Sequence, residues 1–168
     1  GPAAQSGAPP TGTAGRPTRP RPRPAACRAG SDAAARADRE LAKAPPYGSA
    51  KDTGNMLGCV AQNVLDGTMP QWQAQALDKA RATTLMLDVR SRSEFARGHL
   101  AGALNIPHLQ LRTRLDEVST AADGRPVSVY CASGVRSYLA TRVLLSEGFQ
   151  ARNLSGGWLT LKAVHPSL

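Results

Sequence analysis

Short apolar runs alternate with helical patterns through the second half of the chain, and this alternation restricts the fold more than any other feature. The runs TLMLDV, ALNIP, VSVYC and ARNLSG lie at residues 84–89, 103–107, 127–131 and 151–156. Between and after them, apolar residues recur at the spacing of one helix face. Strands separated by helices indicate a mainly parallel sheet. The sequence therefore predicts an α/β domain over residues 83–168.

The helices expected in this domain begin and end at recognisable residues. The first is a short turn from Ser93 to Gly98 that a polar side chain caps. The longest begins at Ser137, turns Leu139, Val143 and Leu144 inward, and ends at Gly148. In total, we expect helices at residues 93–98, 109–118, 137–148 and 157–164.

The first quarter of the chain differs sharply in composition. Residues 1–40 are rich in Pro, Arg and Ala and include RPTRPRPRP, which suits neither helix nor strand, so we expect a disordered segment with local polyproline II conformation. Most of the net charge of +9 comes from this part, since residues 1–46 hold eight Lys/Arg against three Asp/Glu. A basic arm for nucleic acid is the alternative, but the segment has no aromatic residue to stack on bases. We predict no nucleic-acid partner.

Two further segments precede the domain. Residues 41–67 contain Pro45-Pro46 and then a helical pattern from Asn55 to Leu65, whose apolar stripe one short helix cannot bury alone. We interpret this segment as the end of a larger domain. Residues 68–82 are expected to be a linker that holds a short helix near residues 73–82.

The cysteines and the apolar runs limit the class of protein. Cys27, Cys59 and Cys131 are odd in number and widely spaced, which favours reduced thiols in a cytoplasm over a disulfide framework. The three histidines are also scattered, so we predict no metal site. No apolar run reaches the ~20 residues that span a bilayer, and residues 1–30 lack the apolar core of a secretory signal. We expect no membrane partner.

Cys131 stands where a parallel sheet places its ligands. It ends the third strand, and the turn after it leads directly into a helix whose first N–H groups are unpaired. The helix dipole and Arg136 add positive charge, while Gly134 allows the backbone to curl. Ser133 and Ser137 can add hydroxyl donors. We therefore expect a lowered pKa for the Cys131 thiol and a cradle for a sulfur-borne negative charge; a buried strand-end cysteine that packs as a small apolar residue is the alternative.

Three ordered motifs resemble the rhodanese-type sulfurtransferases. CASGVRS at residues 131–137 resembles the active-site loop of that family. LDVRSRSEFARGHLAGALNIP at residues 87–107 resembles its other signature, and LSGGWLTL at residues 154–161 resembles its ending. The resemblance covers residues 83–168. It implies a five-stranded parallel sheet flanked by helices.

The resemblance also implies a chemistry. Cys131 would accept a sulfane sulfur as a persulfide and pass it to a thiol or cyanide acceptor, with Arg136 as the second catalytic residue and no cofactor for that step. Ala132, Ser133, Gly134, Val135 and Ser137 would form the substrate-binding loop. Asp88 and Arg90 are supporting residues; we favour a paired, loop-holding role for them over an anion guide. Glu94 is expected to pair with Arg97 or His99.

Two other functions are open on the sequence. Related phosphatases have a loop one residue longer, wide enough for a tetrahedral phosphate, so the shorter loop from Cys131 to Arg136 favours sulfur. The second is a non-catalytic rhodanese module that docks to, or regulates, a flavoenzyme. Because such inactive modules commonly lack the cysteine, the presence of Cys131 argues against this role.

The segment before the domain carries a second resemblance. APPYGSAKDTGNMLGCVAQNVLDG at residues 44–67 resembles the end of the dimerisation domain of coenzyme A-disulfide reductase-like flavoenzymes that end in a rhodanese domain. In that family the tyrosine matching Tyr47 lies near the partner subunit's active site. No G-x-G-x-x-G fingerprint occurs in the sequence, so FAD and NAD(P)H are expected only for absent parent domains.

The second resemblance shapes the remaining expectations. The chain would be the carboxyl-terminal fragment of an FAD-dependent pyridine nucleotide-disulfide oxidoreductase, with homodimerisation through the parent domain. Thiosulfate, polysulfide and coenzyme A persulfide are the candidate sulfur donors, and small thiols are the candidate acceptors. Cys59 lies in the apolar helical pattern and is expected in a core, not in redox chemistry.

Overall fold

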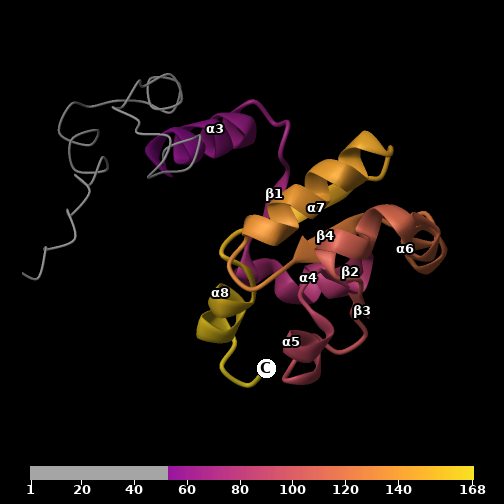
Figure 1. The fold of residues 1–168 in the computed structure, drawn as a ribbon. Coiled ribbons are helices and arrows are strands. Elements are labelled where there is room, and N and C mark those ends of the chain that lie inside the picture. The colour runs from indigo at the N-terminus through magenta and orange to yellow at the C-terminus, as the bar shows by residue number, and fades with distance from the viewer. Residues whose placement is uncertain (1–52) are drawn as a thin grey trace, which may run out of the picture.

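The structure is a computed structural model that describes residues 53–168 (Figure 1). The segment expected to be disordered at residues 1–40, and residues 41–52 with Tyr47, lie outside the described residues. The first described element is the helix α3 (Thr53–Leu65), which matches the expected helical pattern. Everything after it belongs to one sheet with helices on both faces.

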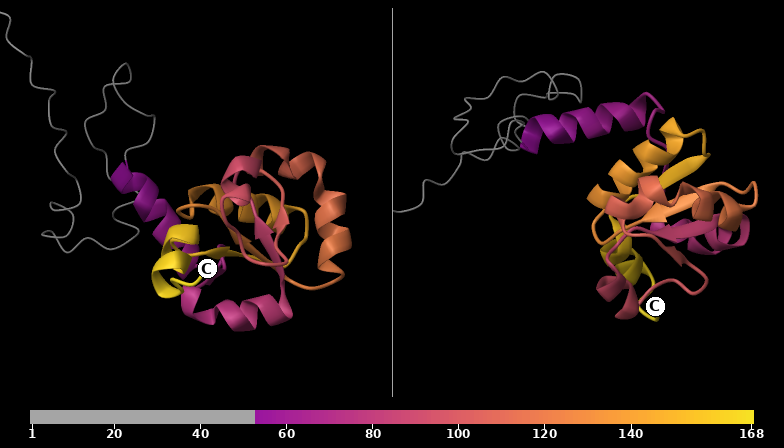
Figure 2. Two further views of the ribbon diagram at one scale, coloured as in Figure 1. Left: turned by 90° about the horizontal axis from the view of Figure 1, so that it is seen from below. Right: turned by 45° about the vertical axis from the view of Figure 1, so that its right-hand side comes forward.

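Five parallel strands form the sheet, which confirms the predicted fold class. Their spatial order is β1-β5-β4-β2-β3, and every neighbouring pair runs parallel. Consecutive strands are joined by helical crossovers, which pass over the two faces (Figure 2). The strands are β1 (Gln71–Trp72), β2 (Leu85–Asp88), β3 (Leu104–Asn105), β4 (Val127–Tyr130) and β5 (Ala151–Leu154).

Residues 68–82 belong to the sheet domain and are not the expected linker, although the short helix expected near residues 73–82 is present. β1 pairs with β5 in this stretch, with Gln71 opposite Asn153 and Trp72 opposite Leu154. A 3-10 turn, η2 (Ala74–Ala76), and the helix α4 (Leu77–Thr83) follow it. A strand of two residues has no alternation to detect, so its place in the sheet depends on tertiary packing of Trp72, which is 3% exposed.

The helices differ in detail from the pattern-based expectation. The helix expected at residues 109–118 is a 3-10 turn, η3 (His108–Thr113), followed by α6 (Leu115–Ala122), because Arg114 leaves helical conformation between them. The helix expected from Ser137 begins two residues earlier, as α7 (Val135–Ser146), and its Leu139 is exposed instead of inward. The remaining helices are α5 (Arg92–Ala96) and α8 (Gly157–Val164).

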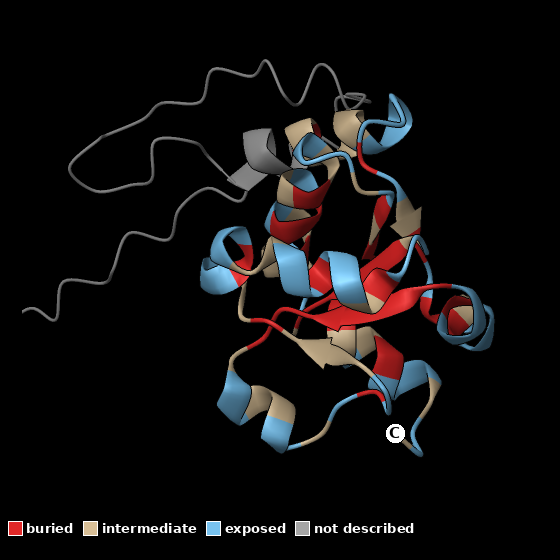
Figure 3. Cartoon of the chain, turned by 90° about the vertical axis from the view of Figure 1, so that its right-hand side faces the viewer, coloured by how far each residue is buried: buried red, intermediate tan, exposed pale blue. Residues whose placement is uncertain are grey.

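Two apolar cores lie on the two faces of the sheet. Figure 3 shows the central strands as the buried layer, with exposed residues on the outer sides of the helices. One core joins the strands to α6 and α7 through Val118, Ala140 and Leu144. The other joins them to α4 and α8 through Leu77 and Leu161. The helices thereby fix where each strand ends, and with it the site described below.

The helix α3 is held to the domain at its end. Asn63 Nδ2 donates to the Tyr138 hydroxyl of α7 at 2.6 Å, and Asn63 O accepts from the N–H of the buried Met69. Leu65, on the same helix, is 73% exposed. Cys59, expected in a core, is half-buried.

Replacement of Trp72 by alanine tests whether residues 71–72 belong to the fold. A buried Trp in the second core should cost about 3–5 kcal/mol in the free energy of unfolding when truncated. Urea denaturation followed by circular dichroism measures this loss. Leu65→Ala, at an exposed position just outside the domain, is the control and should change the free energy by less than about 0.5 kcal/mol. Equal effects of the two substitutions would mean that residues 68–82 are a linker and not part of the folded domain.

Candidate functional site

The candidate site lies where β4 ends and α7 begins. β4 and its neighbour β2 end at the same edge, since Tyr130 stands opposite Asp88 in the parallel register. Cys131 follows β4 directly and is 1% exposed. The loop from Cys131 to Gly134 then turns into α7 with Gly134 at φ +105°. The carboxyl edge of a parallel sheet is the usual position of a binding site.

The first helical turn of α8 fixes the orientation of this loop. The N–H of Trp158 donates to the carbonyl of Cys131 at 2.7 Å, and that of Leu159 donates to the carbonyl of Ala132 at 3.0 Å. Gly157 allows this approach: at φ +64°, it has so little space that a Cβ would lie 2.6 Å from Cys131 O. Because these two loop carbonyls point to α8, the N–H groups of the loop can point toward the sulfur.

The Cys131 sulfur receives several hydrogen bonds. The N–H of Gly134 donates to Sγ at 3.2 Å, and the Ser137 hydroxyl donates to it at 3.3 Å. Burial raises the pKa of the Cys131 thiol, but bonds from the Ser137 hydroxyl and from the N–H groups of Ser137, Gly134 and Ser133 outweigh burial and lower that pKa overall. The arrangement stabilises a thiolate.

The residues expected to form a substrate-binding loop follow Cys131, and they differ in how they face the sulfur. Ala132 is half-buried, Val135 is 66% exposed, and Ser137 is buried beside the sulfur. The Ser133 side chain is exposed and makes no hydrogen bond within the described part of the chain, so only its backbone faces the sulfur. The Ser133 hydroxyl therefore does not bond to the sulfur, and its contribution toward a bound anion stays a prediction.

Arg136 is held by Glu94, which the sequence analysis paired wrongly. The two terminal nitrogens of Arg136 donate to the two carboxylate oxygens of Glu94, both at 2.7 Å. Arg97 and His99, the partners expected for Glu94, do not take part; the His99 ring instead stacks on Phe95. Sequence spacing suggested neighbours on the same helix, whereas the true partner lies on α7. Glu94 was thus missed as a site residue.

Asp88 and Arg90 form a buried support beside the site. The Asp88 carboxylate accepts from the Arg90 backbone N–H at 2.9 Å and from its guanidinium at 2.6 Å. The same guanidinium donates to the Gly98 carbonyl and lies 4.7 Å from the Trp158 ring centre, over its face. These contacts leave Arg90 only 3% exposed. The two residues are paired and buried, as expected for residues that hold the loop. Trp158, at the start of α8, joins this support.

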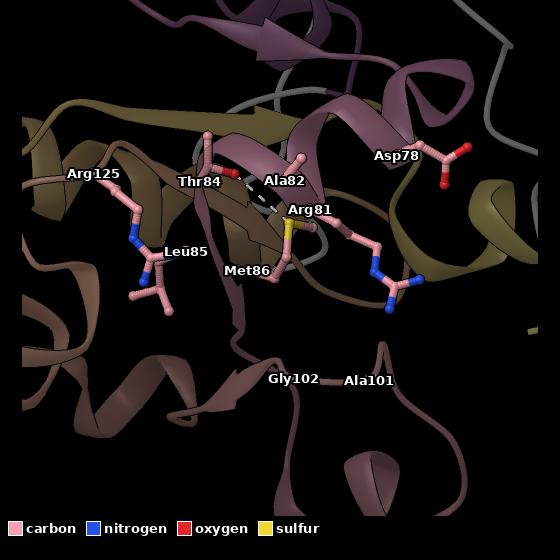
Figure 4. Close-up of a pocket in the computed structure, with 9 residues that line it drawn as sticks. All are labelled: Asp78, Arg81, Ala82, Thr84, Leu85, Met86, Ala101, Gly102 and Arg125. Atoms are coloured by element: carbon pink, nitrogen blue, oxygen red, sulfur yellow. Dashed lines mark hydrogen bonds between the residues drawn. The ribbon is translucent and has the colours of Figure 1, made fainter.

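A hollow in the described part of the surface lies away from Cys131. It measures about 460 Å³ and is open to solvent. Figure 4 shows Arg81 and Arg125 extending into it from two sides. Its residues include Leu85 at the start of β2 and Arg125 just before β4, so it lies at the edge of the sheet opposite the site. Its lining residues are Asp78, Arg81, Ala82, Thr84, Leu85, Met86, Ala101, Gly102 and Arg125.

The described part of the chain contains neither a metal-binding group nor a membrane-spanning helix. Across residues 53–168, no group of three or more His, Cys, Asp or Glu residues is arranged to hold a metal ion. Within that same range, no helix combines the length and apolar character that a membrane crossing requires.

Comparison with known proteins identifies relatives of this chain. The family model for the rhodanese-like domain matches residues 69–163. The chain is 42% identical over 74 residues to an uncharacterised Bacillus subtilis protein, YqhL, covering 44% of this chain and 56% of that protein. It is 38% identical over 85 residues to the thiosulfate sulfurtransferase GlpE of Coxiella burnetii, and the match covers 49% of this chain and 76% of that protein.

Two solved structures are similar over most of the chain. Reduced CoADR-RHD of Bacillus anthracis has a TM-score of 0.72 and 35% identity, over 85% of this chain and 25% of that one. An NAD-dependent persulfide reductase from A. fulgidus has a TM-score of 0.65 and 35% identity, over 81% of this chain and 24% of that one. The chain thus spans about a quarter of the length of these two proteins.

Removal of the Ser137 hydroxyl tests which group stabilises the thiolate. Because this hydroxyl donates to Sγ, Ser137→Ala should raise the pKa of the Cys131 thiol and slow alkylation by iodoacetamide at neutral pH about tenfold. The measurement is the alkylation rate of Cys131 against pH, read by mass spectrometry of the Cys131 peptide. Ser133→Ala is the matched control, since the exposed Ser133 hydroxyl does not reach the sulfur. A shift of equal size in both variants would contradict the assignment to Ser137.

Proposed function

Because the chain belongs to the rhodanese-like domain family, we propose that it is a sulfurtransferase whose Cys131 carries a sulfane sulfur as a persulfide. The observation that carries this proposal is the set of donors aimed at Cys131 Sγ, from the Ser137 hydroxyl and the N–H groups of the loop. These donors stabilise negative charge on sulfur. A cysteine that only filled space at a strand end would not need them.

The first half of the reaction loads the sulfur. The Cys131 thiolate attacks the sulfane sulfur of the donor, a new S–S bond forms, and the bond between that sulfur and the rest of the donor breaks. The donor fragment leaves with the electron pair of the broken bond. Negative charge then lies on the outer sulfur of the persulfide, where the loop N–H groups and the α7 dipole stabilise it.

The second half passes the sulfur on. A thiolate or cyanide attacks the outer sulfur and forms a bond to it, and Cys131 Sγ leaves with the electron pair as a thiolate. The donors that lower the pKa of the Cys131 thiol make this sulfur a better leaving group. Both halves therefore depend on the same hydrogen bonds, and neither step needs a metal ion or an organic cofactor.

We further propose that this domain serves a larger oxidoreductase. Two solved structures that are much longer than this chain match most of it, and one of them is an NAD-dependent persulfide reductase. FAD and NAD(P)H would belong to such parent domains and not to residues 53–168. Polysulfide and coenzyme A persulfide, along with thiosulfate, are the donor classes that fit this role, and a homodimer would form through the parent domain.

Intact-mass measurement tests the sulfur transfer directly. After incubation with thiosulfate, polysulfide or an organic persulfide, the protein should gain the mass of one sulfur atom and lose it when cyanide is added. Cys131→Ser should abolish the gain, whereas Cys59→Ser, which removes the other thiol of the described residues, should leave it unchanged. Failure of every donor to load Cys131 would favour the non-catalytic docking module instead.

A further inference from the structure

The carboxylate of Glu94 is fully engaged beside the site. Its Oε1 accepts from one terminal nitrogen of Arg136, and its Oε2 accepts from the other. Oε2 also accepts from the backbone N–H and from the hydroxyl of Ser91, both at 2.9 Å. Ser91 Oγ in turn accepts from the Glu94 N–H, which completes a capping box at the start of α5. The side chain of Glu94 is therefore fixed before any donor arrives.

This engagement changes what Arg136 offers to a donor. A two-pronged ion pair with a carboxylate uses one N–H of each terminal nitrogen and cancels the net charge of the guanidinium. The side chains of Arg136 and Glu94 are 29% and 24% exposed, so an approaching donor meets both. The pKa of Glu94 is held far below its usual range, chiefly by Arg136, so the carboxylate is ionised at neutral pH. The pair is neutral as a whole.

Arg136 is close enough to the sulfur for this neutral pair to matter. In the first turn of α7 it stands between Gly134 and Ser137, and both of these residues donate to Cys131 Sγ. Its guanidinium also has a raised pKa, to which Glu94 contributes most and the Cys131 sulfur contributes further. A donor that reaches Cys131 Sγ therefore passes within range of both members of the pair. An unpaired arginine there would attract a dianion more than a monoanion, because the Coulomb energy scales with the donor charge.

We propose that Glu94 is the residue that sets the charge of the sulfur donor accepted at Cys131: by pairing with Arg136 it disfavours dianionic donors relative to monoanionic ones. This role rests on the proposed function, because it requires that Cys131 be loaded. Glu94 acts through Arg136 and is a positioning residue that determines specificity.

Two donors of matched shape separate charge from reactivity. Thiosulfate is a dianion, and methanethiosulfonate is a monoanion with a methyl group in place of one oxygen. The Cys131 thiolate attacks the terminal sulfur of either donor, and the S–S bond of the donor breaks. Sulfite leaves thiosulfate with the electron pair, and methanesulfinate leaves the other donor. The enzyme persulfide is the same in both cases. The intrinsic reactivities of the two donors cancel when their kcat/KM ratio is compared between protein variants, so a change in that ratio reports donor recognition.

The test compares this ratio between the wild-type protein and Glu94→Gln, with cyanide as acceptor and thiocyanate as the measured product. Glutamine keeps the size of the side chain and removes its charge, which frees the positive charge of Arg136. The ratio of thiosulfate to methanethiosulfonate kcat/KM should rise about fivefold, as one added unit charge near the donor implies. Glu94→Asp, which retains the charge, should stay within about twofold of the wild-type ratio.

Two further variants make the result decisive. Glu117→Gln is the matched control, since Glu117 also forms a two-pronged pair, in which Nε and one terminal nitrogen of Arg114 donate at 2.6 and 2.7 Å. This pair lies on the exposed side of α6, so the ratio should not change. Arg136→Gln leaves the Glu94 carboxylate unpaired, so its ratio should fall below the wild-type value. This variant also carries the test if Glu94→Gln does not fold.

The outcomes separate this inference from the proposed function. A merely structural role for Glu94 predicts that Glu94→Gln slows both donors equally, and an unchanged ratio in Glu94→Gln and in Arg136→Gln would overturn the inference. Wild-type protein that transfers sulfur from neither donor, and gains no sulfur by mass from any other, would instead overturn the proposed function.

Discussion

Two hydrogen bonds from α8 to the loop after β4 determine the chemistry of this domain. The N–H groups of Trp158 and Leu159 bind the carbonyls of Cys131 and Ala132, so those carbonyls cannot turn toward the sulfur. What faces the sulfur instead is a set of N–H groups and the Ser137 hydroxyl. A loop with the same residues but a free backbone would present a mixture of both dipoles. The reactivity of Cys131 thus depends on a helix that begins 26 positions later in the printed sequence.

The buried guanidinium of Arg90 connects the supports of the site. It binds the Asp88 carboxylate at the end of β2, the Gly98 carbonyl and the faces of Trp158 and Tyr130. The end of β2, the loop before β3 and the start of α8 are therefore held by one charged group. Since Asp88 neutralises this group, Arg90 is no longer available to attract a donor. Arg90 and Arg136, which both lie near the site, are each paired with a carboxylate.

Sequence patterns were sufficient for four of the five strands and for the position of Cys131 at the end of β4. Long apolar runs located β2, β4 and β5, and a cysteine at the end of β4 followed by Gly134 located the loop. Patterns failed where a feature depends on residues far apart in the chain. β1 is too short to have a period, and the Glu94–Arg136 pair joins positions 42 residues apart. The sequence indicated a polar cap and a helix start at Ser93, whereas the capping box joins Ser91 to Glu94. The second contact of Glu94, with Arg136 on α7, depends on the packing of α5 against the site.

The position of α8 has a consequence for the newly made protein. A chain leaves the ribosome from its amino terminus, so Cys131 emerges before Gly157, Trp158 and Leu159 do. Until those residues are released and dock, the carbonyls of Cys131 and Ala132 lack their partners, and the thiol has the modest reactivity of a cysteine in an unfolded peptide. The hydrogen bonds that orient the loop and lower the pKa of the Cys131 thiol are therefore complete only once synthesis has passed α8.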